Sequence, residues 1–178
     1  MPSTNKKKPA PASARGGASS AKKSDLEGRK APAFTLADTD GNPVSLSELI
    51  GRSNLVLYFY PRDMTPGCTT EACDFRDSLA SVRKAGAQIV GVSADGAASH
   101  QKFTEKHGLN FPLLSDIDNK VGKLYGVYKK KSLYGREFMG IERTTFLIDR
   151  TGIIRKVFPK VKVAGHAVEV VAALKEIR

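Results

Sequence analysis

The sequence predicts a single α/β domain with a mixed β-sheet flanked by helices. Two continuous apolar runs, NLVLYFY (54–60) and AQIVGVSA (87–94), show no alternation with polar residues, which is typical of central strands buried on both faces. Each run is followed by a segment with helical spacing, as in an α/β layout. Farther on, RTTFLID (143–149) and GIIRKVF (152–158) flank a DRTG turn and predict a hairpin, which would add antiparallel strands to the sheet. A chain of 178 residues has room for one such domain with a real core.

The elements before the first buried run are short. APAFTLAD (31–38) predicts a strand and DGNP (40–43) a turn. SLSELIG predicts a short helix, because Ser45 and Glu48 have the spacing of a capping box and Gly51 supplies a stop.

A longer helix is predicted between the two buried runs. It begins between Pro66 and Thr69 and ends at Gly86. Apolar residues recur there at steps of three and four, which places them on one stripe of the helix: Ala72, Phe75, Leu79 and Val82.

The remaining segments alternate in type. AASHQKFTEKHG (97–108) predicts a helix ending at its glycine, and PLLSD (112–116) predicts a short edge strand. NKVGKLYG (119–126) predicts another short helix. KKKSLYGREFMG (129–140) has poor periodicity and predicts a long surface loop. HAVEVVAALKEIR (166–178) predicts a final amphipathic helix.

Charge and composition separate the N-terminus from the rest. Residues 1–30 carry eight Lys or Arg and two acidic residues, so they hold +6 of the net charge of +11. Residues 1–28 are rich in Ala, Pro, Ser and Gly and predict a disordered basic tail, with the folded domain spanning 29–178. Such a tail is either a solubilising extension or a weak, nonspecific contact with nucleic acid through phosphate charge, and its Lys-rich composition without amphipathic spacing disfavours a transit peptide.

The same considerations predict a location. We expect neither a secretory signal nor a membrane span, because no apolar stretch is long enough. Two cysteines are too few for a disulfide-stapled secreted scaffold. We therefore expect a cytoplasmic, monomeric protein, with association with nucleoid or nucleus through the tail as an additional possibility.

Cys68 and Cys73 lie five positions apart in TPGCTTEAC, at the start of the long predicted helix. A helix places the Cα atoms of residues i and i+5 roughly 8.6 Å apart. A disulfide requires less than about 7 Å. The spacing therefore argues against a static disulfide and allows a bridge only if the first turns unwind.

A metal site is a weaker interpretation of the cysteine pair. Zinc needs two further ligands, and the candidates are His100, His107 and His166. Each histidine is better explained as a surface or partly buried residue, so no metal is expected.

A reactive thiol remains, beside the alternative that both cysteines pack as small hydrophobes. Cys68 would lie at a helix N-terminus, just beyond a central strand, where free N–H groups and the helix dipole favour thiolate. Cys73 would lie one and a half turns farther along, in a less activating environment.

The segment YPRDMTPGC, with Pro61, Thr65 and Cys68 in the pattern P-x-x-x-T-x-x-C, resembles the peroxiredoxin active-site motif. TPGCTTEAC is similar to the bacterioferritin comigratory protein (peroxiredoxin Q) branch in particular. APAFTL, GVSADGAASHQKF, FPLLSD, YGREFMGIERTTFLID and GIIRKVF carry the resemblance over nearly all of 29–178, and the tail lies outside it.

The resemblance implies a thioredoxin-like fold and a role for each motif residue. Cys68 would be the peroxidatic thiolate and Cys73 the resolving thiol. Thr65 would hydrogen-bond the peroxide, Pro61 would shield the thiolate, and Arg143 would supply a fixed cation. Without the resemblance these three would be interpreted as a helix cap, a strand terminator and a solvated charge.

The implied activity is antioxidant: a thiol peroxidase that reduces hydrogen peroxide and organic hydroperoxides without metal or organic cofactor, recycled by a thioredoxin-like reductant. Two alternatives stay open at the level of sequence. One is a disulfide reductase or isomerase of the same fold, which the absence of C-x-x-C disfavours. The other is a nucleic-acid-binding protein whose thiols are incidental.

Overall fold

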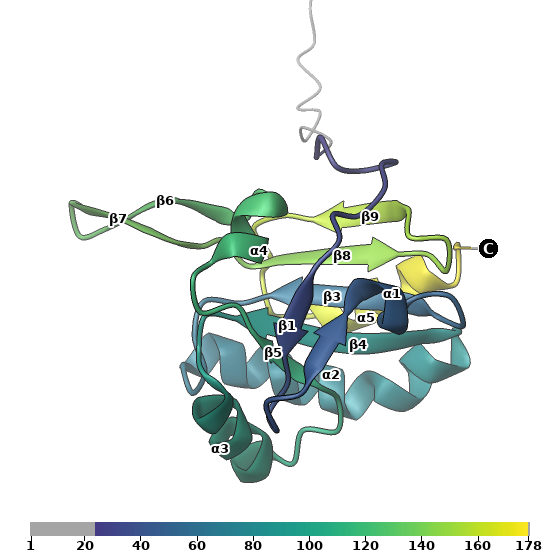
Figure 1. The fold of residues 1–178 in the computed structure, drawn as a ribbon, viewed down its shortest axis with the longest axis horizontal. Coiled ribbons are helices and arrows are strands. Elements are labelled where there is room, and N and C mark those ends of the chain that lie inside the picture. Colours follow the sequence, from purple (N-terminus) through teal and green to yellow (C-terminus); the bar gives the residue numbers. More distant parts are fainter. Residues whose placement is uncertain (1–23, 178) are drawn as a thin grey trace, which may run out of the picture.

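The computed structural model describes residues 24–177. Its centre is a seven-stranded mixed sheet (Figure 1). The strands are β1 (Thr35–Ala37), β2 (Pro43–Ser45), β3 (Asn54–Phe59), β4 (Ala87–Ser93), β5 (Leu113–Ser115), β8 (Thr144–Ile148) and β9 (Ile154–Phe158), in the spatial order β2-β1-β5-β4-β3-β8-β9. β3, β4 and β5 are parallel, and the other pairs are antiparallel.

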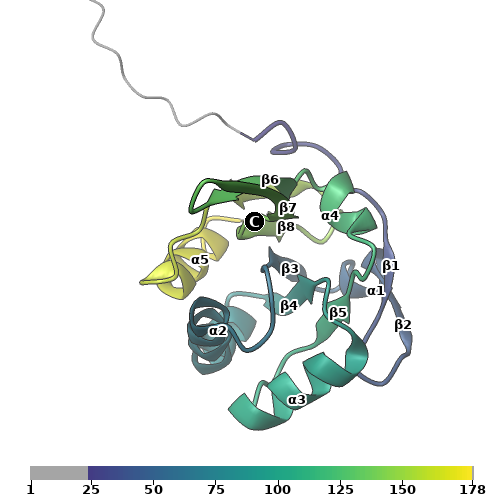
Figure 2. The ribbon, with the colours of Figure 1, turned by 90° about the vertical axis from the view of Figure 1, so that its left-hand side faces the viewer.

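Helices cover both faces of this sheet, as Figure 2 shows. They are α1 (Leu46–Leu49), α2 (Pro66–Lys84), α3 (Ala97–His107), α4 (Lys120–Leu124) and α5 (His166–Leu174). Successive residues of β3 alternate between two hydrophobic cores: Val56 and Tyr58 pack with α2, α3 and α5, whereas Leu55 and Leu57 pack with α1 and α4. All six residues of β3 are buried, which confirms the predicted central strand.

The predicted long helix is confirmed as α2, which is one continuous helix containing both cysteines. Its predicted apolar stripe is buried, and Gly86 follows its end with φ 79°. The capping box of α1 is also present, because the Ser45 N–H donates to Glu48 Oε2 at 2.8 Å.

Two predicted elements are wrong. β5 is not at an edge, because β1 pairs with its outer side, and all three of its residues are buried. The predicted loop at 129–140 is a hairpin formed by β6 (Tyr128–Leu133) and β7 (Arg136–Ile141). Tyr134 and Gly135 form its two-residue turn, both with positive φ, as tight hairpins of this kind require. Strand periodicity is hidden there because both faces of the hairpin are largely exposed.

Two histidines also differ from the prediction. His100 is completely buried on α3, and His166 is buried at the start of α5. His166 Nε2 lies 2.8 Å from Thr145 Oγ1, and burial lowers the pKa of His166. Only His107 is partly buried as expected. Residues 24–177 contain no group of three or more His, Cys, Asp or Glu side chains placed to hold a metal ion.

The tail prediction falls mostly outside the described residues, since residues 1–23 belong to it. Residues 24–28, which were predicted to belong to the tail, contact the folded part. The Gly28 N–H donates to Ile154 O at 2.7 Å, and Leu26 packs against the core that contains α1 and α4, which we call the α1–α4 core. Among residues 24–177 no helix is long and apolar enough to cross a membrane.

Candidate active site

The candidate site lies where β3 leads into α2. Residues 61–65 connect the two, and the Tyr60 N–H donates to Val92 O at 3.1 Å, so the connection starts from a fixed strand end. Thr65 is the N-cap residue, Pro66 is the first helical residue, and Cys68 is the third. In the first turn of a helix, N–H groups such as those of Gly67 and Cys68 have no intrahelical acceptor. Cys68 therefore lies at the positive end of the α2 dipole.

Arg143 supplies a cation directly to the thiol. Its Nη2 lies 3.3 Å from Cys68 Sγ, and Cys68 is buried. The pairing of β3 with β8 brings Arg143 to Cys68. Phe59 at the end of β3 pairs with Thr144 at the start of β8, so Arg143, the residue before β8, lies beside the start of α2. A Cβ on Gly67 would lie 3.2 Å from Arg143 Nη2, so glycine allows the close approach of the guanidinium.

Glu71, which was not among the predicted site residues, forms a cluster with Cys68 and Arg143. It is three residues after Cys68 on the same face of α2, and Arg143 Nη1 donates to its Oε2 at 2.8 Å. We call Cys68, Glu71 and Arg143 the thiol cluster. Burial of the carboxyl raises the pKa of Glu71 to about 7, although the Arg143 charge opposes that shift. The other carboxylate oxygen, Oε1, is buried and has no hydrogen-bond partner within residues 24–177.

A signal for Glu71 is present in the sequence. Cys68, Glu71, Ala72 and Phe75 are spaced i, i+3, i+4 and i+7, so the glutamate lies on the buried stripe of its helix. A charged residue on a buried stripe requires a partner, which here arrives from β8.

The other predicted site residues are placed differently. Thr65 is at the N-cap, but its hydroxyl donates to Arg62 O at 3.0 Å and makes no cap hydrogen bond. Pro61 is partly buried and lies two residues beyond the end of β3. Cys73 is partly buried, and both cysteines are free thiols. On an intact helix their Cα atoms are roughly 8.6 Å apart, which is beyond disulfide reach. The structure thus brings Cys68 and Arg143 together and keeps Cys73 apart from them.

A second buried polar group fixes the loop before α2. We call Tyr60, Asp63, Ser99 and His100 the anchor cluster. The Asp63 carboxylate accepts hydrogen bonds from Tyr60 Oη at 2.6 Å and Ser99 Oγ at 2.8 Å, and it lies 2.7 Å from His100 Nδ1. Burial alone would raise the pKa of Asp63, but the hydrogen bonds from His100 and Tyr60 outweigh it and hold that pKa below its ordinary value.

The histidine of the anchor cluster faces acceptors on both sides. His100 Nε2 lies 3.1 Å from Leu114 O, which can only accept, and Nδ1 faces the Asp63 carboxylate. The Asp63 N–H also donates to Asp95 Oδ2 at 2.8 Å. The loop that carries Pro61 and Thr65 is thereby attached to α3 and to the end of β4.

Comparisons with known proteins agree with this geometry. A family model described as the AhpC/TSA family matches residues 28–157. The chain is 51% identical to peroxiredoxin Bcp of Bacillus subtilis over 150 residues, which cover 84% of this chain and 95% of that protein. It is 52% identical to a putative peroxiredoxin of Coxiella burnetii over 147 residues, 83% of this chain and 97% of the other.

Solved structures give the same result. Peroxiredoxin Q of Xanthomonas campestris superposes with a TM-score of 0.77 at 46% identity, covering 81% of this chain and 90% of that one. The BcpB structure from Mycobacterium tuberculosis has a TM-score of 0.77 at 38% identity, covering 86% and 98%. The fold is thus the thioredoxin-like fold of peroxiredoxins, and the chain belongs to the AhpC/TSA family, within its Bcp or peroxiredoxin Q branch.

Proposed function

We propose that this peroxiredoxin reduces hydrogen peroxide and organic hydroperoxides through Cys68. The observation that carries the proposal is the Arg143 guanidinium, 3.3 Å from the sulfur of a buried cysteine at a helix N-terminus. A structure of the Xanthomonas campestris relative is described in terms of alkyl peroxide reduction, which supports the same substrate class here.

In the proposed first step, the Cys68 thiolate attacks one peroxide oxygen in line with the O–O bond. The S–O bond forms as the O–O bond breaks, and the leaving oxygen takes a proton and departs as water or alcohol. Cys68 becomes a sulfenic acid. Arg143 and the free N–H groups of the first turn stabilise the charge that moves across the O–O bond. Thr65 donates its hydroxyl to the peroxide by turning from Arg62 O, and Pro61 shields the thiolate.

In the second step, the Cys73 thiolate attacks the sulfenic sulfur and hydroxide leaves as water. The disulfide cannot form on the intact helix, because the two Cα atoms are too far apart. The first turns of α2 therefore unwind, at a cost of about 1 kcal/mol for each hydrogen bond lost. A thioredoxin-like dithiol then restores both thiols by exchange. No metal or organic cofactor takes part in this scheme.

The decisive experiment is stopped-flow consumption of hydrogen peroxide and of an alkyl hydroperoxide, with and without thioredoxin. We expect one equivalent to be consumed rapidly per chain without thioredoxin and continuous turnover with it. Insulin reduction without peroxide consumption would instead identify a disulfide reductase.

The role of Cys73 has a separate test. Cys73→Ser should still react once with peroxide, but it should lose thioredoxin-supported turnover and proceed to sulfinic acid in excess peroxide, because its sulfenic acid has no internal partner. Mass spectrometry reports the oxidation state of Cys68. An unchanged thioredoxin-linked rate would exclude Cys73 as the resolving thiol.

We also propose that the enzyme is a cytoplasmic monomer whose tail makes weak, nonspecific contact with nucleic acid. The support is charge, since residues 1–23 contain six Lys or Arg and no acidic residue. Deletion of residues 1–23 should leave peroxide kinetics unchanged and reduce the affinity for DNA at low salt. Equal binding by the full-length and truncated proteins would contradict the proposal.

A further inference from the structure

The β6–β7 hairpin extends away from the body of the molecule as an arm (Figure 1). Its strands pair along their full length, from Tyr128 opposite Ile141 to Leu133 opposite Arg136. Figure 2 shows it at the end of the molecule where α2 begins. One residue, Glu142, separates the last residue of β7 from Arg143 of the thiol cluster.

The arm is attached firmly at its base. Ile141 is buried in the α1–α4 core, and Tyr128 packs against it. Lys131 Nζ donates to Ile141 O at 3.0 Å, and Lys129 Nζ lies 3.3 Å from Glu142 Oε1. The direction in which the arm leaves the body is therefore set by these contacts.

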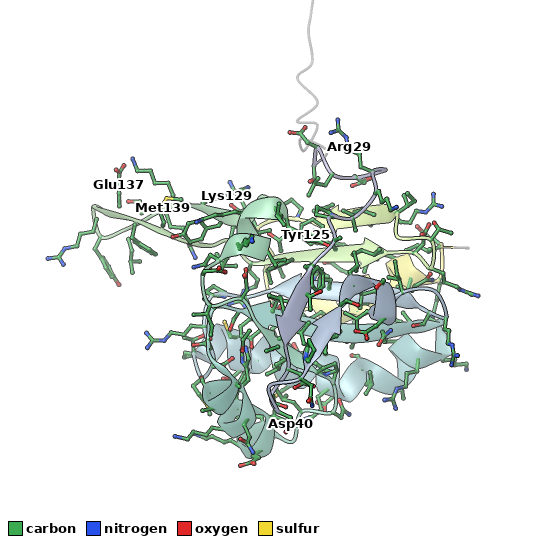
Figure 3. All side chains as sticks on the ribbon, viewed as in Figure 1. Arg29, Asp40, Tyr125, Lys129, Glu137 and Met139 are labelled. Atoms are coloured by element: carbon green, nitrogen blue, oxygen red, sulfur yellow. The ribbon has the colours of Figure 1, made fainter. Side chains whose placement is uncertain are left out.

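The outer part of the arm exposes apolar side chains. Four of the eight exposed large apolar residues within 24–177 lie in it: Leu133 at 57%, Tyr134 at 97%, Phe138 at 45% and Met139 at 51%. Met139 and Glu137 project from it into solvent (Figure 3). Clustered exposed apolar residues mark an interaction surface, whereas single ones do not.

One face of the arm combines two of these apolar residues, Leu133 and Phe138, with cations. Side chains of directly paired residues point to the same face of a sheet, and alternate pairs share that face. Phe138 lies opposite Lys131, and Leu133 lies opposite Arg136. Lys129 shares this face but is paired with Glu142, so Lys131 and Arg136 are its remaining cations, and no acidic residue of 128–141 lies on it. The segment 128–141 as a whole has four Lys or Arg and one Glu, a net charge of +3.

We propose that this face, which we call the docking face, binds the protein that reduces the Cys68–Cys73 disulfide. This inference rests on the proposed function, because the reductant is the one protein that the proposed cycle brings to the start of α2. The partner it fits is a protein dithiol whose reactive sulfurs are bordered by apolar and acidic groups. The apolar side chains would be buried in the complex, and the cations would speed the encounter with an acidic surface.

Other occupants fit less well. A nucleic acid would match the cations and find one ring for base stacking in Phe138, but no step of the proposed cycle brings a nucleic acid beside the thiol cluster. A second copy would bring two positively charged arms together. A protein reductant uses the apolar residues, the cations and the position beside the thiol cluster at once.

The test separates docking from chemistry by using two reductants. Turnover of saturating hydrogen peroxide is measured with thioredoxin, recycled by its reductase, and with dithiothreitol, which needs no docking surface. The variants are Leu133→Ser/Phe138→Ser and Arg136→Glu, all at exposed positions. Matched controls are Val168→Ser, an exposed apolar residue of α5, and Lys102→Glu, an exposed cation of α3.

We expect the double variant to lower kcat/KM for thioredoxin about tenfold, as loss of interface anchors does, with turnover on dithiothreitol unchanged. Arg136→Glu should lower it several-fold at low salt and less at high salt. The controls should match the wild type with both reductants.

Wild-type kcat/KM for thioredoxin in both hairpin variants would overturn the docking face. The affinity of each variant for DNA, from fluorescence anisotropy, and its mass, from gel filtration, are measured as well. If the hairpin substitutions change only the DNA affinity, the face binds nucleic acid instead, and if they change only the mass, it is a contact between two copies of this chain. Failure of the wild type to consume peroxide even with dithiothreitol would be a different result, since it would overturn the proposed peroxidase activity itself.

Discussion

The thiol cluster and the anchor cluster lie on either side of the same short loop, yet they differ in how completely their polar atoms are hydrogen-bonded. The Asp63 carboxylate has a close polar partner for each oxygen, and both ring nitrogens of His100 face acceptors. In the thiol cluster, Glu71 Oε1 has no partner within the described residues, and the Arg143 side chain is 16% exposed. A buried polar network whose groups are all hydrogen-bonded stiffens the structure around it, whereas a buried polar atom without a partner costs free energy and needs an explanation, such as a catalytic role.

The comparison also explains why the two clusters are neighbours. A reacting thiolate needs its hydrogen-bond donors held in place before the peroxide arrives. The anchor cluster fixes residues 61–65 from one side, and α2 starts on the other. The molecule thus places a satisfied hydrogen-bond network directly beside the helix turns that unwind in the proposed mechanism.

The largest expected effect lies within the thiol cluster. Cys68→Ser should abolish peroxide consumption, because no other thiol within residues 24–177 lies at a helix N-terminus beside a cation. Its free energy of unfolding should change by less than about 1 kcal/mol, since serine is nearly the same size. Stopped-flow kinetics and urea unfolding measure the two quantities. Substantial residual turnover would remove Cys68 from the role of nucleophile.

The anchor cluster should behave in the opposite way. Asp63→Ala leaves the buried His100 ring without its carboxylate, and breaking such a pair lowers the free energy of unfolding by about 3–5 kcal/mol. Asp40→Ala, in an exposed turn (Figure 3), is the matched control and should change it by less than about 0.5 kcal/mol. A loss below 1 kcal/mol for Asp63→Ala would mean that the anchor cluster is not structural.

Arg143→Met tests whether Arg143 acts on Cys68 through its charge or through the packing of its side chain. It keeps a long apolar stem but removes the cation from Cys68, so peroxide attack should slow about 10²–10³-fold. The fold should remain, because the guanidinium is partly exposed and outside both hydrophobic cores. An unchanged rate of peroxide attack, with the structure intact by circular dichroism, would return Arg143 to the status of a surface charge.

The smallest expected effect is on the pH dependence of stability, through Glu71, whose Oε1 has no hydrogen-bond partner within residues 24–177. Burial raises the pKa of Glu71 from 4.5 to about 7, so between these pH values the folded chain keeps a proton that the unfolded chain has lost. This group therefore makes the free energy of unfolding fall as pH rises from about 4.5 to about 7. Glu71→Gln removes that dependence, and its stability relative to wild type should rise by about 1–3 kcal/mol from pH 5 to pH 8. Parallel stability curves for the two proteins would contradict it.

Sequence patterns located the reacting helix well. The continuous apolar run of β3 and the stripe of α2 depend on local spacing, and local spacing placed both cysteines correctly on one helix. Arg143 could not be placed by spacing, because it lies 75 residues from Cys68 and reaches it through the pairing of β3 with β8. Only the family resemblance singled it out.

Each error has a physical origin of its own. The β6–β7 hairpin lacks a buried face, so its strands show no apolar alternation. β5 has only three residues, and nothing in so short a run reveals that β1 will cover its outer side. His100 was expected to be a surface or partly buried residue because histidine has no fixed preference, although its spacing of three from Phe103 places both on the buried face of α3.

The pairing of β3 with β8 has a consequence for a growing chain. Residues 54–93 contain β3, α2 and β4, which are contiguous and can assemble as soon as they are made. Arg143 is synthesised 75 residues after Cys68, and the strand that positions it follows directly. A partly synthesised chain thus holds Cys68 without the neighbouring cation, and the thiol cluster is complete only when the sheet is nearly complete. The order of synthesis therefore keeps Arg143 away from Cys68 until most of the sheet has been made.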